Sequence, residues 1–190
     1  ISGNENTAVG NQSLNNLTAG NNNIGIGSDA QVPNNTGSNQ IRLGNTAITY
    51  AGVQVAWTVT SDRKWKENIK DSDLGLDFIT KLKPVSYLRK NDESKKNEYG
   101  FIAQDVEEVL KETGSENSGI ISKDDNGNYE MRYNDLFAPM VTAMQELKAE
   151  NDELKRKLTE YEQTQALIIS EIEKLKSLKS DTKEIKLGEK

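Results

Sequence analysis

The composition of the chain changes at the stretch Ser61-Asp62-Arg63-Lys64-Trp65-Lys66-Glu67-Asn68-Ile69. Only three of the first 60 residues carry a charged side chain, whereas charged residues make up 28% of the whole chain. The segment before Ser61 is rich in Asn and Gly, and the segment after it is rich in Lys, Asp and Glu. We therefore predict that two modules of different kinds are joined at Ser61.

Overall composition limits the possible functions. At 190 residues, the chain has a hydrophobic content of 34% and an aromatic content of 6%, which is low for a self-sufficient core, so we expect something outside the single chain to complete it. A net charge of -6 and a pI of about 4.9 argue against a nucleic-acid partner. The chain has no cysteine, and its apolar runs are too short for a membrane span. We expect a soluble chain and, because it opens on Ile1 without Met or a signal peptide, a fragment of a longer protein.

Residues 1–60 contain a repeat with a period of 17 residues. Glycines recur in two series, and pairs of mostly apolar residues recur between them: Gly3, Gly20, Gly37; Gly10, Gly27, Gly44; Thr7 and Val9, Ile24 and Ile26, Ile41 and Leu43. Each pair is spaced by two, which predicts a short strand with one buried face followed by an Asn/Gly turn. Such units must stack on each other or on other chains, as in solenoids and trimeric fibre shafts. The alternative, a disordered Asn-rich linker, would have no reason to keep this register.

Two further patterns lie in the same module. Residues 48–60 read as a strand, because Val53, Val55 and Trp57 alternate. The run from Gly25 to Ala30 fits a dinucleotide-binding pattern, but we discount it because Pro33 and two asparagines follow it where that motif needs a helix.

Residues 61–135 predict a small α+β domain. We expect helices at residues 74–82 and 103–111, the second with Val106, Val109 and Leu110 on one face, and strands at residues 85–89 and 99–102 around a charged loop at 91–97. Strands at 120–123 and 129–133 flank the turn signal Asn126-Gly127. A calcium loop is the rival interpretation, but Ser122 and Tyr133 would occupy positions that need Asp and Glu, so the hairpin is favoured.

A heptad pattern begins at Phe137. Its seam positions alternate spacings of three and four: Phe137, Met140, Met144, Leu147, Asn151, Leu154, Leu158, Tyr161, Gln165, Ile168, Ile172 and Leu175. We predict a coiled-coil helix over residues 136–178, capped by Asn134 and tolerant of Pro139 in its first turn, followed by a frayed tail at 179–190. Polar Asn151 and Gln165 in the seam would fix register and strand number. A single amphipathic helix lying on the domain is the alternative, but the pattern is longer than a small domain can cover.

Candidate chemistry is limited because the chain has neither His nor Cys. A Ser-His-Asp triad, a thiol nucleophile and an ordinary zinc site are excluded, which leaves a hydroxyl activated by Lys. Ser61 and Lys66 are five residues apart and would not share a helix face, so Ser61 must lie outside any helix and fold back onto Lys66. An ordinary Lys titrates near pH 10.4, so burial or a nearby cation such as Lys64 would have to favour the neutral amine, with Trp65 as a flanking group. In the alternative, purely structural interpretation, Ser61 and Asp62 cap a helix and Lys66 is a solvated surface charge.

Four groups of residues resemble landmarks of a known family. They are Ser61, Asp62, Lys66 and Ile69; Pro84-Val85-Ser86-Tyr87; Gly100-Phe101-Ile102-Ala103-Gln104-Asp105-Val106; and Tyr133-Asn134-Asp135-Leu136. Their order over residues 61 to about 160 resembles the self-cleaving intramolecular chaperone domain at the C-terminus of endosialidase-type phage tail spikes, tail fibres and related trimeric surface proteins. The preceding repeat resembles head and stalk repeats of trimeric adhesins and tail fibres.

The resemblance implies a homotrimer that cleaves its own backbone between Thr60 and Ser61 and releases the C-terminal part once the upstream fibre has folded. Ser61 and Lys66 would be the catalytic pair of a single-turnover serine endopeptidase, and Asp62 would orient Lys66 or Arg63. No cofactor, metal, nucleic acid or membrane span is expected. The implied location is a phage or prophage tail fibre or tail spike, or alternatively a bacterial surface. A purely structural trimeric fibre or adhesin tip that stays attached is the competing hypothesis.

Overall fold

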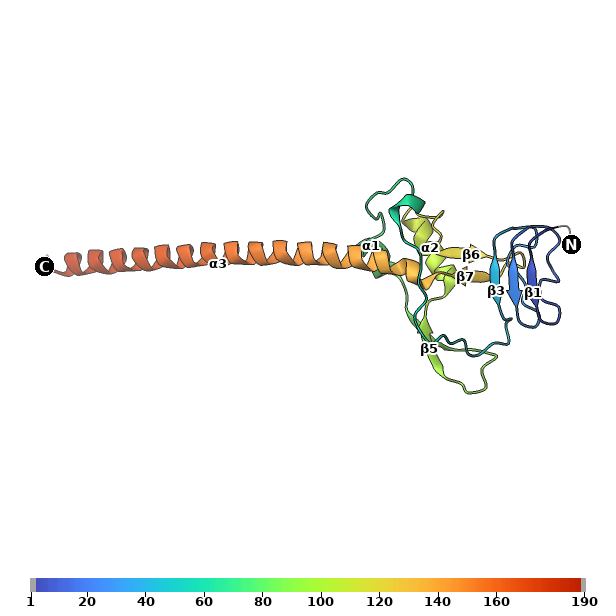
Figure 1. Cartoon of the computed structure of the whole chain (residues 1–190). Helices are drawn as coiled ribbons and strands as arrows, with labels where there is room; N and C mark the ends of the chain where they lie inside the picture. Colours follow the sequence, from blue (N-terminus) through green and yellow to red (C-terminus); the bar gives the residue numbers. More distant parts are fainter. Residues whose placement is uncertain (1–2, 189–190) are drawn as a thin grey trace. The chain divides into compact units, whose positions relative to one another are not determined.

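The computed structural model describes residues 3–188, and of residues 180–188 only the backbone. The chain forms two compact units, Ile1–Thr142 and Ala143–Lys190. The first unit contains all of the short strands and the shorter helices, and the second contains most of the long C-terminal helix. The elements, in chain order (Figure 1), are β1 (Thr7–Val9), β2 (Ile24–Ile26), β3 (Ile41–Leu43), a 3-10 turn (Arg63–Trp65), α1 (Leu76–Lys81), β4 (Val85–Leu88), β5 (Asn97–Gly100), α2 (Ala103–Glu112), β6 (Ile121–Lys123), β7 (Tyr129–Met131), a second 3-10 turn (Tyr133–Leu136) and α3 (Phe137–Gly188).

The three repeats stack on one another within one chain. Strands β1, β2 and β3 form a parallel sheet in which Thr7 pairs with Ile24 and Ile24 pairs with Ile41 (Figure 1). Paired residues are 17 apart, which is the period of the repeat. Each repeat is therefore one coil, which adds its strand beside the strand of the previous coil. The predicted strands are therefore confirmed, and the stacking partner of each coil is the next coil of the same chain.

The buried face of the repeats differs from the prediction. The core cluster is Leu14, Leu17 and Val32, which lie between the strands in sequence, whereas Val9 and Ile41 on the strands are 57% and 66% exposed. The interior is too narrow for large strand side chains: a Cβ on Gly25 would lie 2.7 Å from two carbon atoms of Leu14. The outer face of the sheet therefore carries a stripe of aliphatic side chains, which the sequence analysis had assigned to the inside.

Side-chain amides connect successive coils. The backbone N–H of Asn23 donates to Asn6 Oδ1 at 3.0 Å, and the backbone N–H of Gln40 donates to Asn23 Oδ1 at 3.0 Å. Asn23 is fully buried, and its Nδ2 donates to the carbonyl of Gly37 at 3.0 Å. Because a buried polar group must be paired, these bonds explain why Asn recurs at the period of the repeat.

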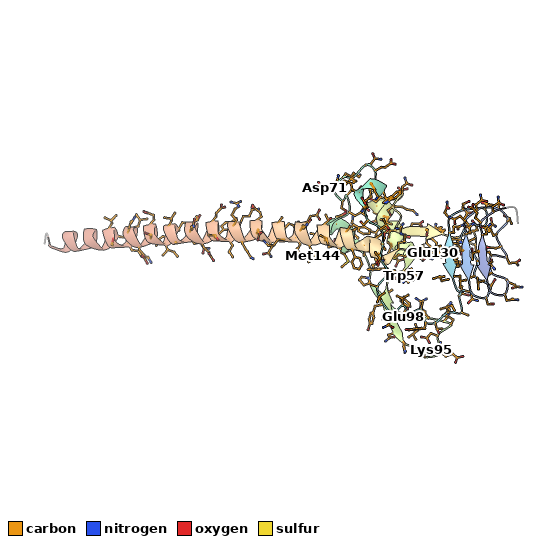
Figure 2. All side chains as sticks on the ribbon, in the orientation of Figure 1. Trp57, Asp71, Lys95, Glu98, Glu130 and Met144 are labelled. Atoms are coloured by element: carbon orange, nitrogen blue, oxygen red, sulfur yellow. The ribbon has the colours of Figure 1, made fainter. Side chains whose placement is uncertain are left out.

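Residues 48–60 do not form the predicted strand. Their apolar side chains are exposed, including Val55 at 78% and Trp57 at 73% (Trp57 is labelled in Figure 2). The alternating pattern was recognised correctly, but a strand requires a neighbour to accept its backbone hydrogen bonds, and none of the described residues supplies one. The segment is irregular chain between the two modules.

The α+β part of the first unit surrounds one hydrophobic core. Helices α1 and α2 contribute Phe78 and Val106, each 1% exposed, and the segments after α2 contribute Ile120 and Leu136. Two antiparallel hairpins, β4–β5 and β6–β7, complete this part. The predicted helices, hairpin and apolar face of α2 are confirmed, with strand ends shifted by at most two residues.

The long helix α3 begins later than predicted and extends further. Tyr133–Leu136 forms a 3-10 turn, so Asn134 lies inside this turn and accepts the backbone N–H of Phe137 through its carbonyl. Pro139 falls in the first turn of α3, where its missing N–H costs no hydrogen bond. The backbone is helical through Gly188, past Lys179, where the sequence predicted fraying. Among the described residues, no helix is both long enough and apolar enough to cross a membrane.

Candidate functional site

Ser61 lies immediately before a short 3-10 turn that reverses the chain. Asp62 is the N-cap residue of this turn, with φ -67° and ψ 136°, and its Oδ1 accepts the backbone N–H of Lys64 at 3.0 Å. The backbone N–H of Lys66 then donates to the carbonyl of Arg63 at 3.0 Å. An Asp at an N-cap satisfies an otherwise unpaired N–H, so the local sequence is sufficient to form the turn. The turn places residue 66 next to residue 61.

The side chains of Ser61 and Lys66 are in direct contact. Lys66 Nζ donates a hydrogen bond to Ser61 Oγ at 2.7 Å. Ser61 lies outside the turn, as the five-residue spacing required, and the bond Thr60–Ser61 lies in exposed chain. A serine hydroxyl and an amine at this distance are within reach of proton transfer.

Asp62 and Arg63 take other roles than the sequence analysis assigned to them. Asp62 pairs with Lys64, with Oδ2 3.3 Å from Nζ, rather than with Lys66 or Arg63. Arg63 takes part through its backbone carbonyl. The Lys64 ammonium also lies 5.8 Å from the centre of the Trp65 ring. Asp62 therefore shapes the turn that carries Lys66, which is an indirect effect on the lysine. The missed partner Lys64 follows Asp62 by two residues, which is the usual N-cap spacing.

Burial of the site is incomplete in the single chain. The turn and its surroundings are exposed, and the flanking Trp65 is itself 73% exposed. Exposed apolar side chains continue on both sides, including Val59 at 74% and Ile69 at 55%. Large apolar groups at this density are typical of a surface that is covered by another chain.

The later landmarks lie together at the packing of β5 against the second 3-10 turn. The hydroxyl of Tyr133 accepts the backbone N–H of Phe101 at 3.1 Å, and the two rings lie 6.2 Å apart. A Cβ on Gly100 would lie 2.4 Å from the same hydroxyl, so a larger residue there would require the Tyr133 side chain to move. These residues hold the fold of the domain and are not in contact with Ser61.

Glu107 on α2 is a charge centre that the sequence analysis missed. Its carboxylate lies 2.9 Å from Lys123 Nζ on β6 and 3.1 Å from Lys111 Nζ, and it accepts the Tyr129 hydroxyl at 3.1 Å. Lys123, followed by Lys111 and Tyr129, lowers the pKa of Glu107 from its ordinary 4.5 to about 2. Glu107 therefore fixes the β6–β7 hairpin to α2. The spacing of Glu107 and Lys111 was visible in the sequence, but the contacts to residues 123 and 129 depend on the tertiary fold.

Comparison with known proteins gives a family match over part of the chain. Residues 61–115 match the model of the peptidase S74 family, described as the chaperone of endosialidase. No curated protein matches the chain. The matched segment begins at Ser61, and it contains the Ser61–Lys66 pair, both elements of the β4–β5 hairpin and α2. The match supports a chaperone role and the peptidase theme for this module.

Proposed function

We propose that the chain is an intramolecular chaperone that trimerises, helps an upstream tail-fibre or tail-spike-like segment to fold, and releases itself by cutting its own backbone between Thr60 and Ser61. The observation that carries this proposal is the 2.7 Å contact between Lys66 Nζ and Ser61 Oγ, at the start of the segment that matches the chaperone of endosialidase family. The implied setting is a phage or prophage fibre, with a bacterial surface fibre as the alternative.

In the proposed reaction, Ser61 is the nucleophile, and Lys66 first accepts a proton and then donates it. Ser61 Oγ attacks the carbonyl carbon of Thr60 while a neutral Lys66 amine accepts the hydroxyl proton. The C–N bond then breaks, the Ser61 nitrogen takes the proton from Lys66, and the Thr60 acyl group is left as an ester on Ser61 Oγ. Water hydrolyses the ester, giving a Thr60 carboxylate and a free Ser61. The reaction consumes one water molecule and requires neither a metal nor a cofactor.

Trimerisation would complete this site. Lysine is charged in water at neutral pH, so a neutral amine requires burial or a nearby cation. Neighbouring chains would supply that burial by covering the exposed Val59, Trp65 and Ile69. Cleavage would then be conditional on assembly, since the separate chain leaves Lys66 in solvent.

The mass of the freshly expressed protein tests the reaction. Wild type should yield a fragment of residues 61–190 with Ser at its N-terminus. Ser61→Ala and Lys66→Ala should stay whole. Lys70→Ala is the matched control, because Lys70 is an exposed neighbour that pairs with Asp73 at 3.2 Å, and it should cleave like the wild type.

Asp62 allows a second, finer test. Asp62→Asn keeps an oxygen that accepts the Lys64 N–H, whereas Asp62→Ala removes the cap. If the cap positions Lys66, Asp62→Asn should cleave faster than Asp62→Ala; equal rates would show that the carboxylate charge matters instead.

A non-cleaving structural tip is the competing function, and the exposure of Ser61 and Lys66 in the single chain is the observation that favours it. A wild-type chain that stays whole during long incubation as a folded trimer would establish this alternative. Ser61→Ala and wild type would then be indistinguishable by mass.

The chaperone role rests on how differently the two modules fold. The parallel coils pair residues 17 apart, whereas a helix forms locally and quickly. A trimeric coiled coil would hold three repeat segments at high effective concentration. Cleavage after folding would remove the template, so that the finished fibre is kinetically trapped. A melted, cleaved protein should therefore refold poorly and the Ser61→Ala protein well; equal refolding would show that the C-terminal module is no template.

A further inference from the structure

The β6–β7 hairpin touches the third repeat, which comprises the turn before β3 and β3 itself. Asp125 at the hairpin tip donates its backbone N–H to the carbonyl of Pro33 at 2.8 Å, and its carboxylate accepts the backbone N–H of Asn35. In the middle of β7, Glu130 Oε1 lies 3.0 Å from Arg42 Nη1. The contacts therefore reach both the turn that precedes β3 and the strand itself. Glu130 is labelled on β7 in Figure 2, and Figure 1 shows β6 and β7 beside β3.

The repeat and the hairpin carry opposite charges at this contact. Arg42 is the sole cationic side chain in residues 1–60, and it faces a hairpin that carries Asp124, Asp125 and Glu130. The side chains of Arg42 and Glu130 are 35% and 33% exposed, so the pair is partly shielded from solvent. A cation placed at this one position of a nearly neutral module favours a partner with acidic groups.

Hydrogen bonds within its own loop hold the hairpin tip in shape. Asp124 Oδ1 accepts the backbone N–H groups of Asn126 at 2.9 Å and Asn128 at 2.8 Å, and Gly127 has a φ of +78°, which favours glycine. The amide of Asn128 lowers the pKa of Asp124, and Arg42 adds a smaller effect in the same direction. The strand pair next to the turn, Lys123 and Tyr129, is held by Glu107. A preorganised loop loses little conformational entropy on docking.

The contact surface is polar and open. A hollow of about 390 Å³ lies between the hairpin and the repeat, and it is lined by residues of both, among them Arg42, Thr46, Asp124 and Tyr129. Wet, polar contact surfaces of this kind are typical of reversible association. The amide of Asn91 in the β4–β5 loop, which donates to the carbonyl of Thr46, adds a second polar tether.

We propose that the β6–β7 hairpin is a docking surface for the third repeat, and that it holds residues 61–190 on the repeats after the backbone has been cut. Backbone cleavage and physical release are then separate steps, and release is controlled by an ionic contact. The retention step rests on the cleavage proposed above, but the docking surface itself exists in the uncut chain and can be tested there.

The first experiment uses the Ser61→Ala chain, which stays whole whatever the wild type does. Amide hydrogen exchange is measured at Asn35 and Asp125 in four versions: unchanged, Arg42→Glu, Glu130→Arg and both together. Each single reversal places like charges side by side and should speed exchange on the order of tenfold, while the double reversal should restore protection. Lys83→Glu, a charge reversal at an exposed lysine before β4, should have no effect. Unchanged exchange in the single reversals would overturn the docking surface.

The second experiment tests retention in the cut chain. The protein is cut by itself or, if it does not self-cleave, at a protease recognition sequence placed in the exposed residues 52–59. Size-exclusion chromatography at 50 mM salt should show the two fragments together, and 1 M salt should separate them, because the Debye length falls to about 3 Å. Arg42→Glu should separate at low salt, and the double reversal should co-elute again. Separation of the wild-type fragments at low salt, or co-elution of Arg42→Glu like wild type, would overturn retention. Failure of self-cleavage alone would affect only the proposed function.

Discussion

The repeats and α3 solve the problem of backbone pairing in opposite ways. In the repeats, hydrogen bonds join residues 17 apart, and the buried core of the coils is the cluster of Leu14, Leu17 and Val32. In α3, ion pairs join residues three or four apart, such as Arg156 with Glu153 at 2.8 Å, and the apolar heptad positions are exposed. The repeats depend on contacts between residues distant in sequence, whereas the helix is stabilised by local contacts and its apolar heptad positions are uncovered in the single chain. In the proposed function, α3 would form first and the repeats would persist once formed.

The largest effect is expected from changing the seam of α3. Leu154→Asp should abolish the proposed trimer, because a leucine is lost and a carboxylate added in all three chains at once, and each buried leucine contributes about 1.5–3 kcal/mol. In the uncut Ser61→Ala chain, the mass measured by analytical ultracentrifugation should fall from three times 21.1 kDa to 21.1 kDa. Leu167→Asp is the matched control: Leu167 is 69% exposed and Leu154 is 64% exposed in the single helix, but only Leu154 lies in the seam. Equal effects of the two changes would exclude the heptad seam as the contact.

Within the repeats, the largest loss of stability is expected from substitution of Gly20. Its φ is +101°, and a Cβ would lie 2.0 Å from the carbonyl oxygen of Gly37, so Gly20→Ala forces two coils apart. We expect a loss of about 3 kcal/mol or more in the stability of the repeats, seen as fast amide exchange in β2 and β3 with the helical circular dichroism unchanged. Gly114→Ala tests backbone strain alone, since Gly114 has a φ of +71° and open space around it; it should cost roughly 1–2 kcal/mol.

The amide ladder should contribute less than the glycine contacts. Asn23→Ala removes the partners of the Gly37 carbonyl and the Gln40 N–H, and leaving such groups unsatisfied costs about 1–3 kcal/mol. Amide exchange at Gln40 should therefore accelerate while the α2 amides keep their protection. Asn11→Ala removes an exposed asparagine of the same module and should leave amide exchange at Gln40 and in α2 unchanged. If Asn11→Ala accelerated exchange at Gln40 as much as Asn23→Ala does, the amide ladder would not be the stabilising feature.

How far the sequence predicted the structure depends on where the partners of each residue lie. The strands of the repeats, α2 and the β6–β7 hairpin were predictable because their signals are local: a fixed period, a helical face and an Asn-Gly turn. The spacing of Ser61 and Lys66 likewise required a turn between them. Residues 48–60 were predicted as a strand from alternation alone, yet alternation does not supply a pairing partner.

Other features could not be predicted because they depend on contacts across the fold. The 17-residue period does not say which side of the strand faces inward; that is decided by the close approach of Leu14 to Gly25. The pairing of Arg42 with Glu130 joins residues 88 apart, and no local pattern marks it. Asp62 was recognised as a supporting residue, but its contact with Lys64 follows from the 3-10 turn, whose type the sequence did not specify.

The smallest effect concerns the anchor of the hairpin on α2, and it appears as a dependence on pH. Lys123, Lys111 and Tyr129 lower the pKa of Glu107 to about 2 in the folded state, against an ordinary value of 4.5. The folded state therefore holds this proton less readily than the unfolded state, so Glu107 stabilises the first unit above pH 4.5, and the contribution is lost as the pH falls from 4.5 towards 2.

Thermal unfolding followed by near-UV circular dichroism between pH 7 and pH 2 measures this contribution. Glu107→Gln should lower Tm at pH 7 and converge with wild type near pH 2, where the wild-type carboxylate is also protonated. Lys123→Met removes the leading cause of the pKa shift and should flatten the pH dependence in the same way, whereas Lys83→Met, at an exposed lysine, should not. A Glu107→Gln curve that stays parallel to wild type down to pH 2 would show that the hairpin is held by packing alone. In that case the repeats would dock on a hairpin whose position does not depend on charge, and acid would weaken the contact only through Glu130 and the other hairpin carboxylates.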